Sequence, residues 1–378
     1  MKVLHVIPSN SPLRGGPTQA LRAYVSALAE QGVGVDVATT NDDGPGLSSA
    51  PLGRPVEEYG GRFHYFARHT RFYTYSPALH SWLQANVSRY DVVHIHAMFS
   101  YPPVSAARLA RQARVPFIIR PLGTMNRYGM TKRGWMKRIS FALLEKSLAE
   151  SSAAMHFTSE AERDEVLELG LRIKPVVIPN PIDVREVAGT EGDPERPSTF
   201  LYLSRIDLKK GLELLLESFA QVAARRTDAR LEVAGSGDPA LVESYKRLAA
   251  TLGIAGRTTW SGFLGGAAKV QAYARAGCFV LPSHSENFGM AAAEAMAHGV
   301  PVIVSDRVPL HHDVASARAG RVVPCEARAL SAAMEAMLDD RASWPAMGRR
   351  GSELVSSRYS RRAVGSRLID LYREVSRR

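Results

Sequence analysis

Short apolar, β-branched runs alternate along this chain with longer segments of helical periodicity. In the first half, the runs that predict buried strands lie at residues 3–7, 34–39, 91–96, 116–119, 153–157 and 175–178. The segment 18–30 places Leu21, Val25 and Leu28 on one helical face, and Gly32 follows its end. This alternation predicts a parallel sheet that helices cover on both faces.

The alternation stops between about residues 180 and 198, where turn-forming and charged residues predict a linker. It then restarts, with strand patterns at 199–203, 230–234, 257–261, 278–281 and 301–304 and helical patterns at 211–225, 240–252 and 290–298. A length of 378 residues also favours two domains. We predict α/β domains at 1–185 and 199–358, a linker at 186–198 and a basic amphipathic helix at 359–378 that packs back on the first domain.

The composition argues against several classes of protein. No uninterrupted apolar run reaches the roughly 18–20 residues of a membrane span, and the first run is too short for a signal peptide. Cys278 and Cys325 form no CxxC pair, so a reducing cytoplasm is the simplest setting. The net charge of +11 suits an anionic partner or serves solubility alone. Because no nucleic-acid-binding motif is found, we expect no nucleic-acid partner.

The most informative segment follows the predicted strand 278–281 and reads SHSENFGMAAAEAMAHGVPVI. Gly289 permits a tight turn into a helix, whose free N–H groups can hold a diphosphate. Glu294 lies in this helix of small residues, where a carboxylate can accept hydrogen bonds from a ribose diol. The alternative for Glu294 is a solvated surface carboxylate.

Glu286 and Glu294, with seven residues between them in this context, resemble the EX7E motif of retaining glycosyltransferases of family 4 (glycosyl transferases group 1). The resemblance extends over the whole chain and is strongest from about 201 to 306. It implies the GT-B architecture, in which two Rossmann-like domains face each other across a cleft. It also implies that Glu286 holds hydroxyls of the transferred sugar and Glu294 the ribose, and that the donor is contacted by Asn287, Phe288, Gly289 and Met290.

Four other segments resemble donor-binding segments of the same family. Arg205 and Lys210 match its Arg…Lys-Gly motif and would stabilise the departing diphosphate, although a solvated basic turn is the alternative. Gly15 and Gly16 resemble its glycine-rich loop, or form only a tight turn. Gly235 and Gly237 would lie in the turn beside the nucleotide. Phe263 and Leu264 would lie in the segment that cradles the base.

The loop at 235–240 also matches the dinucleotide-binding pattern G-x-G-x-x-A. That pattern requires an acidic residue about 20 positions later to hold a ribose, and none occurs between Glu243 and Glu286. This absence counts against an oxidoreductase with a nucleotide cofactor.

The predicted strand 91–96 places His94 and His96 on one face. His96, at the carboxyl end, is a candidate for contact with the sugar or acceptor, and a structural histidine is the alternative. No third metal ligand is evident at motif spacing, and no D-x-D sequence occurs, so we expect no metal site.

One position departs from the family pattern. Leu122 stands where many members have a histidine in a Pro-His-Gly context, so the role of that histidine cannot be carried over. Arg120 and Asn126 are candidates for binding an anionic acceptor or the leaving phosphate. The segment 132–141 interleaves cations with apolar residues, which suits either an anionic membrane surface or an ordinary surface helix.

The sequence thus predicts a metal-independent retaining glycosyltransferase without a cofactor. Its expected substrates are a UDP- or GDP-sugar and the hydroxyl of a glycan or glycolipid acceptor, at the inner face of the membrane or in the cytoplasm. The alternatives are a non-catalytic protein that binds sugar nucleotides or lipids, and a nucleotide-cofactor oxidoreductase.

Overall fold

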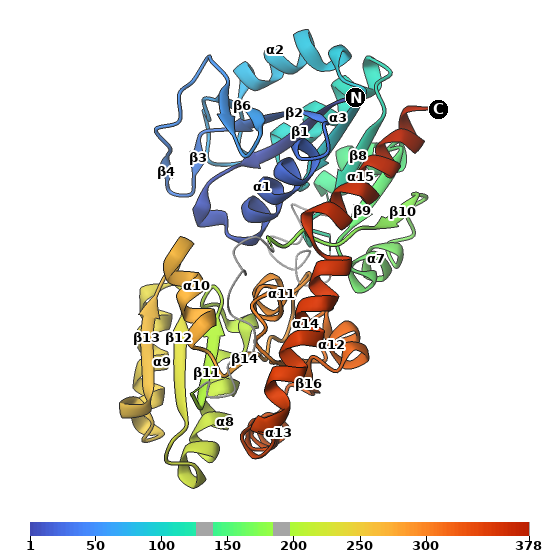
Figure 1. Cartoon of the computed structure of the whole chain (residues 1–378). Helices are drawn as coiled ribbons and strands as arrows, with labels where there is room; N and C mark the ends of the chain where they lie inside the picture. The colour runs from blue at the N-terminus through green and yellow to red at the C-terminus, as the bar shows by residue number, and fades with distance from the viewer. Residues whose placement is uncertain (126–138, 184–196, 378) are drawn as a thin grey trace. The chain divides into compact units, whose positions relative to one another are not determined.

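The computed structural model describes residues 1–125, 139–183 and 197–377. Nearly all of the expected linker, Asn126 and most of the segment 132–141 lie outside these residues. The chain divides into two compact units (Figure 1). Unit 1 comprises Met1–Pro181 and Arg361–Arg378, and unit 2 comprises Ile182–Ser360.

Unit 1 contains an eight-stranded sheet of order β10-β9-β8-β7-β1-β2-β6-β5. Seven strands are parallel and the edge strand β5 is antiparallel to β6, which the sequence did not predict. Asp42–Asp43 (β3) and Gly46–Leu47 (β4) form a separate hairpin. The strands of the large sheet are Lys2–Ser9 (β1), Gly34–Thr40 (β2), Val56–Glu58 (β5), Gly61–Phe66 (β6), Val92–His96 (β7), Phe117–Arg120 (β8), Ala154–Phe157 (β9) and Pro175–Val177 (β10).

The C-terminal helix α15 (Arg361–Ser376) packs back onto unit 1 beside α1 (Gly16–Ala29), as expected (Figure 1). Its apolar positions Val364, Leu368, Leu371 and Val375 are all buried, because they recur on one helical face. The described residues of unit 1 also contain the helices α2 (Pro77–Asn86), α3 (Tyr101–Gln112), α6 (Lys146–Glu150) and α7 (Glu160–Leu167), the π-helical turn Phe141–Glu145 and two short 3-10 turns.

Unit 2 contains a six-stranded parallel sheet of order β13-β12-β11-β14-β15-β16. Its strands are Thr199–Leu203 (β11), Arg230–Ala234 (β12), Thr258–Gly262 (β13), Cys278–Leu281 (β14), Val302–Ser305 (β15) and Gly320–Val323 (β16). Its helices are α8 (Leu212–Arg225), α9 (Pro239–Thr251), α10 (Gly266–Arg275), α11 (Met290–Ala297), α12 (His311–Ala317), α13 (Ala327–Asp339) and α14 (Trp344–Arg358).

The strand order of each sheet contains a switch point. In unit 1 the chain continues outward in opposite directions from β1 and β7, and in unit 2 from β11 and β14. Ligands of open α/β sheets bind at the carboxyl ends of the strands that flank such a point. The loops after these four strands are therefore the first places to examine for a site. Within the described residues, no helix combines the length and apolar character that crossing a membrane requires.

Candidate active site

The switch point of unit 2 brings Lys210 and Glu286 into an ion pair. Lys210 ends the short 3-10 turn Leu208–Lys210 after β11, and Glu286 lies in the loop after β14. The two side chains are only 11% and 13% exposed. A cation and a carboxylate are thus held together, largely shielded from water, where the fold places a ligand.

Close contact between backbones explains why glycines occupy the surrounding loops. Gly211 has a left-handed φ of 68°, and a Cβ there would lie 2.1 Å from the Pro282 carbonyl oxygen. A Cβ on Gly235 would lie 1.8 Å from the Ser204 oxygen, and one on Gly237 would lie 2.3 Å from the Ile206 oxygen. The glycines predicted beside the nucleotide are therefore required to pack the loops after β11 and β12 together.

Two further cations accompany Lys210 in its loop. The Arg205 side chain is 57% exposed and lies 3.9 Å from an Asp207 carboxylate oxygen, so it is accessible to an anionic ligand. Burial, reinforced by the charge of Lys210, holds the pKa of Lys209 below its ordinary value. The backbone carbonyl of Lys209 accepts a hydrogen bond from the His284 N–H, which ties the loops after β11 and β14 together.

Glu294 is not a solvated surface residue. One of its carboxylate oxygens lies 2.9 Å from the Lys269 ammonium, and the other accepts a hydrogen bond of 2.9 Å from the Tyr273 hydroxyl. Its side chain is 17% exposed. Burial and the neighbouring Glu294 hold the pKa of Tyr273 well above its ordinary value, so this hydroxyl remains a donor. The carboxylate is consequently fixed in orientation on α11.

Helix α11 begins at the Gly289 turn that the sequence predicted. Gly289 has a φ of 99°, and a Cβ there would lie 2.7 Å from a Val308 methyl group. Phe288 is buried, with its ring edge-on to that of Tyr359, so packing anchors the residue before the turn. Phe263, after β13, is 66% exposed and offers an aromatic face to a ligand. Asn287, Met290 and Leu264 are each partly exposed.

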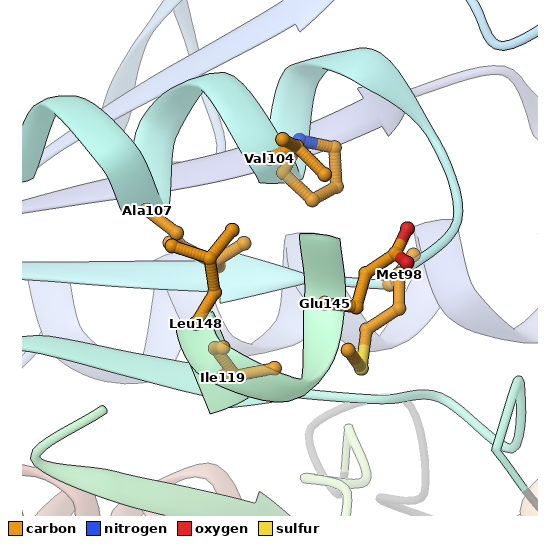
Figure 2. Close-up of a pocket in the computed structure, with 9 residues that line it drawn as sticks. Met98, Val104, Ala107, Ile119, Glu145 and Leu148 are labelled. Atoms are coloured by element: carbon orange, nitrogen blue, oxygen red, sulfur yellow. The ribbon is translucent and has the colours of Figure 1, made fainter. Parts of the chain in front are cut away.

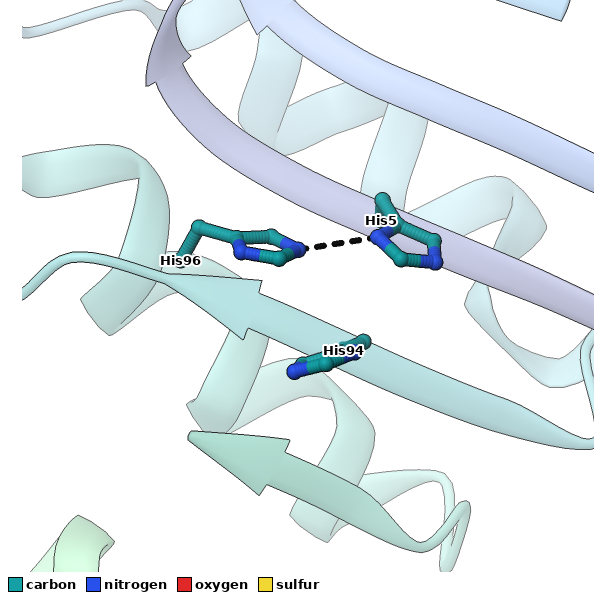
Figure 3. A group of neighbouring side chains, drawn as sticks. All are labelled: His5, His94 and His96. Atoms are coloured by element: carbon teal, nitrogen blue, oxygen red, sulfur yellow. Dashed lines mark hydrogen bonds between the residues drawn. The ribbon is translucent and has the colours of Figure 1, made fainter. Parts of the chain in front are cut away.

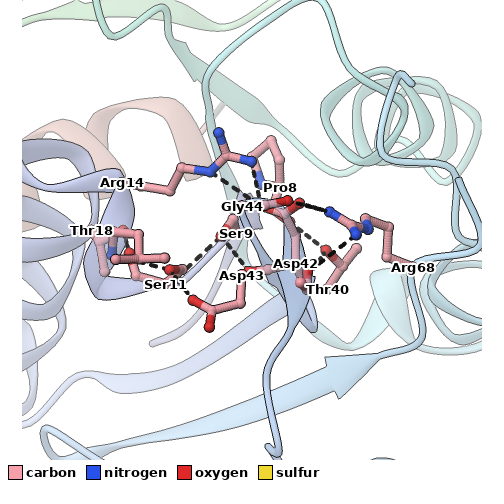
Figure 4. A network of polar contacts seen from close by, with 12 residues as sticks. Pro8, Ser9, Ser11, Arg14, Thr18, Thr40, Asp42, Asp43, Gly44 and Arg68 are labelled. Carbon is pink, nitrogen blue, oxygen red and sulfur yellow. Dashed lines mark hydrogen bonds and ion pairs between the residues drawn. The ribbon is translucent and has the colours of Figure 1, made fainter. Parts of the chain in front are cut away.

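In unit 1 a polar network fixes the glycine-rich loop after β1 (Figure 4). The Arg14 guanidinium donates to Asp42, and Arg68 donates to the other oxygen of the same carboxylate. Burial would raise the pKa of Asp42, but the hydrogen bonds and charge of Arg14, with the Arg68 hydrogen bond, hold it below its ordinary value. By contrast, a Cβ on Gly16 would meet no described atom within 4 Å. The packing of the described residues therefore leaves open space beside Gly16.

His96 and Arg120, predicted to contact sugar or acceptor, lie together beneath the carboxyl edge of the unit 1 sheet. His96 is 0% exposed and Arg120 is 1% exposed. The Arg120 guanidinium donates to the Asn180 side-chain oxygen and stacks on the Tyr24 ring. Neither side chain has a surface for direct contact with a ligand in this structure.

A small apolar pocket lies at the same edge, lined by residues that include Met98, Val104 and Leu148 (Figure 2). It also contains the carboxyl group of Glu145, which accepts hydrogen bonds from the Tyr73 and Ser140 hydroxyls. Burial raises the pKa of Glu145 above its ordinary value. The cavity of about 10 Å³ is room for one water molecule at most, so it is not a sugar site.

Two family models match this chain and meet at the division between its units. The model of glycosyl transferases group 1 matches residues 183–353, and that of the glycosyl transferase 4-like domain matches residues 15–181. The chain belongs to the glycosyltransferase group 1 family. The EX7E segment and the loop with Arg205 and Lys210 both lie within the first match.

One relative supports this assignment, and two solved structures share the fold. The chain is 29% identical over 316 residues to a phosphatidyl-myo-inositol mannosyltransferase of Mycolicibacterium smegmatis, covering 80% of this chain and 76% of that protein. Sucrose-phosphate synthase from Thermosynechococcus elongatus matches with a TM-score of 0.80 at 23% identity, covering 99% of both chains. The Anabaena protein HepE, solved with UDP-glucose, matches with a TM-score of 0.79 at 17% identity, covering 99% of this chain and 100% of that one. The fold of this glycosyltransferase is GT-B.

Sequence reasoning missed Lys269 and Tyr273 of this glycosyltransferase. They lie one helical turn apart on α10, so they share a face, and both reach Glu294. The i, i+4 spacing of a cation and a tyrosine is the only sequence signal for them. The roles expected for the site residues themselves stay predictions.

Proposed function

We propose that this glycosyltransferase transfers a sugar from a UDP- or GDP-sugar to an acceptor hydroxyl, with retention of the anomeric configuration. The observation that carries the proposal is the Lys210–Glu286 pair at the switch point of unit 2, with Arg205 exposed beside it. The bound UDP-glucose of the HepE structure supports a nucleotide sugar as donor. The name of the mannosyltransferase relative supports a glycolipid or glycan as acceptor.

Each site residue has a role in this proposal. Arg205 and Lys210 bind the diphosphate and stabilise the negative charge that develops on it as the glycosidic bond breaks. The N-terminus of α11 adds backbone N–H groups at Gly289. Glu286 accepts hydrogen bonds from sugar hydroxyls, and Glu294 accepts them from the ribose. Gly15 and Gly16 stay predicted donor-phosphate contacts.

The bond changes balance without a protein base. The bond between the anomeric carbon and the diphosphate oxygen breaks, and the acceptor oxygen bonds to the same face of that carbon. The leaving phosphate oxygen takes the acceptor proton. We assign neither Glu286 nor Glu294 as general base. Protein cations take the place of a metal ion on the diphosphate, so the proposed reaction is metal-independent.

A direct experiment incubates the protein with UDP-glucose, GDP-mannose and related donors, with candidate glycolipid and glycan acceptors. Thermal stabilisation by the bare nucleoside diphosphates first selects the base, since a ligand that binds only the folded state raises its stability. Release of the nucleoside diphosphate, together with an α-linked product from an α-linked donor, supports the proposal. An inverted product refutes retention.

One specific observation favours a second candidate, a non-catalytic protein that binds sugar nucleotides. Leu122 stands in the Pro-Leu-Gly segment 121–123, where many members have a histidine. Binding of nucleotide sugar with neither transfer nor hydrolysis above background would favour that candidate.

Contact of the segment 132–141 with an anionic membrane, at its inner, cytoplasmic face, also stays a proposal.

A further inference from the structure

Four histidines from three strands of the large sheet form a buried cluster in unit 1. His5 lies on β1, His94 and His96 on β7, and His156 on β9, and all are 0% exposed. Figure 3 shows three of them, with the Nδ1 atom of His5 2.8 Å from the Nε2 atom of His96. Only His94 and His96 were expected to share a face, because the sequence does not reveal which strands are neighbours.

One end of this cluster fixes the protons of two rings. The Arg120 guanidinium, which can only donate, lies 3.4 Å from Nδ1 of His96. His96 Nδ1 must therefore accept, so a neutral His96 carries its proton on Nε2 and donates it to Nδ1 of His5. His5 in turn carries its own proton on Nε2, which lies 3.4 Å from the Tyr372 hydroxyl oxygen.

The opposite end fixes the other two rings independently. Nε2 of His156 lies 2.7 Å from the Ile178 carbonyl oxygen, which can only accept, so His156 carries its proton there. Nδ1 of His156 then accepts, over 3.2 Å, from Nε2 of His94. Nδ1 of His94 is left as an acceptor, 2.7 Å from the Tyr372 hydroxyl.

The two half-chains meet at one hydroxyl group. Tyr372 must accept from His5 and donate to His94, and a hydroxyl can do both at once. The result is a hydrogen-bond chain of one direction, from Arg120 through His96, His5, Tyr372, His94 and His156 to the Ile178 carbonyl. Every ring nitrogen in it has a partner.

The neutral state that this chain requires agrees with its electrostatics. Burial, with the charge of Arg120 second, lowers the pKa of His5 and His156 to about 3. Burial and the neighbouring rings hold the pKa of His94 and His96 well below the ordinary value. A metal ion at His5, His94 and His96 would break the chain and place further positive charge beside Arg120 with no carboxylate among these ligands.

The Arg120 end of the hydrogen-bond chain lies at the carboxyl edge of the sheet. His96 and Arg120 are the last residues of β7 and β8. The loops that follow contain Ala97, Phe99 and Leu122, which all have left-handed φ between 56° and 71°. Non-glycine residues keep such strained conformations only where the surrounding structure holds them. This edge includes the switch point of unit 1, where ligands of such sheets bind.

We propose that Tyr372 of the C-terminal helix is a positioning residue for the transfer reaction: it closes the hydrogen-bond chain that fixes Arg120 and the loops after β7 and β8. The proposal rests on the proposed function, because it assigns the acceptor side of that reaction to this edge of unit 1. Donor binding in unit 2 should not depend on Tyr372.

The test compares the full chain with Tyr372→Phe and Tyr90→Phe. Tyr90 is a matched control, since it is a buried tyrosine of unit 1 whose hydroxyl donates to Asp36 and takes no part in the hydrogen-bond chain. We expect Tyr372→Phe to lower kcat roughly tenfold, equivalent to about 1.4 kcal/mol of barrier, without changing the Kd of UDP or of GDP, whichever binds. Tyr90→Phe should keep the wild-type kcat. Equal losses in both variants, or an unchanged kcat in Tyr372→Phe, would overturn the proposal.

Nitrogen-15 NMR of the histidine rings tests the chain without any activity. In the wild-type protein at pH 7.5, about one unit above the ordinary histidine pKa, His5, His94, His96 and His156 should all be Nε2–H tautomers. An Nδ1–H tautomer in one of them would refute the hydrogen-bond chain. One bound metal ion per protein molecule would refute it as well. If transfer is absent but the tautomers are as expected, the proposed function and the positioning role of Tyr372 are both refuted. The hydrogen-bond chain itself is then confirmed.

A second pair of variants covers the case in which Tyr372→Phe does not fold. Arg120→Lys keeps a cationic donor at the start of the chain, whereas Arg120→Met removes it. Retention of the four Nε2–H tautomers and of more activity in the lysine variant supports the proposal. Equal activity of the two variants contradicts it.

Discussion

Lys210 and Glu286 form an ion pair although 76 positions separate them in the sequence. The parallel sheet causes this, because β11 and β14 are neighbours and their following loops meet at one edge. The pair places a cation for a diphosphate directly beside a carboxylate for sugar hydroxyls. Replacing either residue therefore changes the environment of the other.

Lys210→Ala should lower both stability and turnover, because it leaves the Glu286 carboxylate largely buried without its cation. We expect a loss of about 1–3 kcal/mol in the free energy of unfolding, measured with urea. The double variant Lys210→Met/Glu286→Gln should recover most of that stability while turnover stays at least about 100-fold down. Recovery of turnover along with stability would show that the pair is only structural.

Arg205→Ala separates chemistry from folding. The side chain is more than half exposed and its distance to Asp207 is 3.9 Å, so the free energy of unfolding should change by less than about 0.5 kcal/mol. Turnover should fall, because a charged contact to the leaving diphosphate is lost. Undiminished turnover in both Arg205→Ala and Lys210→Ala would contradict the roles assigned to these cations.

Two glycine variants should have opposite effects. Gly235→Ala forces a Cβ against the Ser204 carbonyl oxygen and should cost about 3 kcal/mol or more in stability. Gly16→Ala adds a methyl group to open space at ordinary φ, so it should fold normally but bind and turn over the donor poorly. Gly256→Ala, also in open space, is the control for both. Wild-type kinetics in Gly16→Ala would show that this loop is only a tight turn without a role in donor binding.

Stability should fall steeply in acid. The four buried histidines have lower pKa values in the folded chain than the ordinary 6.5, so the unfolded chain takes up their protons first. Their contribution is complete above about pH 6.5 and is lost as the pH falls toward their folded values. Each proton changes the unfolding free energy by about 1.4 kcal/mol per pH unit, so four protons change it by about 5.5 kcal/mol per pH unit.

Urea unfolding between pH 7 and pH 5 measures this slope. The exposed His69 supplies a control, since His69→Asn should leave the slope unchanged. A stability that does not change across this range would mean that the four histidines are protonated in the folded protein.

Chelation tests whether protein cations alone serve the diphosphate. Because the sequence has no D-x-D motif and the predicted site contains Arg205 and Lys210, the enzyme should retain most of its turnover in EDTA. The measurement is initial rate with and without chelator, followed by addition of Mg²⁺ or Mn²⁺. Complete loss in EDTA that either ion restores would refute metal independence.

The sequence predicted the strands that form the centre of each sheet. The runs at 199–203, 230–234 and 278–281 coincide with β11, β12 and β14, because continuous β-branched and aromatic runs between turn residues mark buried parallel strands. The strand β6 was missed, since Arg62 and His64 interrupt its apolar positions and only one face is buried. The antiparallel edge strand β5 is only three residues long.

Motifs placed the candidate site residues in loops after β11 and β14, which flank the switch point of unit 2, but they did not predict contacts between distant residues. The sequence singled out Glu294, and nothing in it linked that residue to Lys269 and Tyr273. His5 likewise carried no signal for His96, because only the order of the sheet makes β1 and β7 neighbours. Contacts of this kind depend on topology, which a local pattern does not contain.

The central claim is that Glu294 binds the ribose and Glu286 the sugar, and calorimetry tests it directly. Titrations would use UDP and UDP-glucose, or GDP and GDP-mannose, with Glu294→Gln, Glu286→Gln and the control Glu335→Gln, whose carboxylate pairs with Arg225 outside the predicted site. We expect Glu294→Gln to weaken both ligands roughly 10- to 100-fold, since a charged carboxylate contributes about 1.5–3 kcal/mol. Glu286→Gln should weaken only the intact donor. Normal binding of the bare diphosphate by Glu294→Gln would contradict the account.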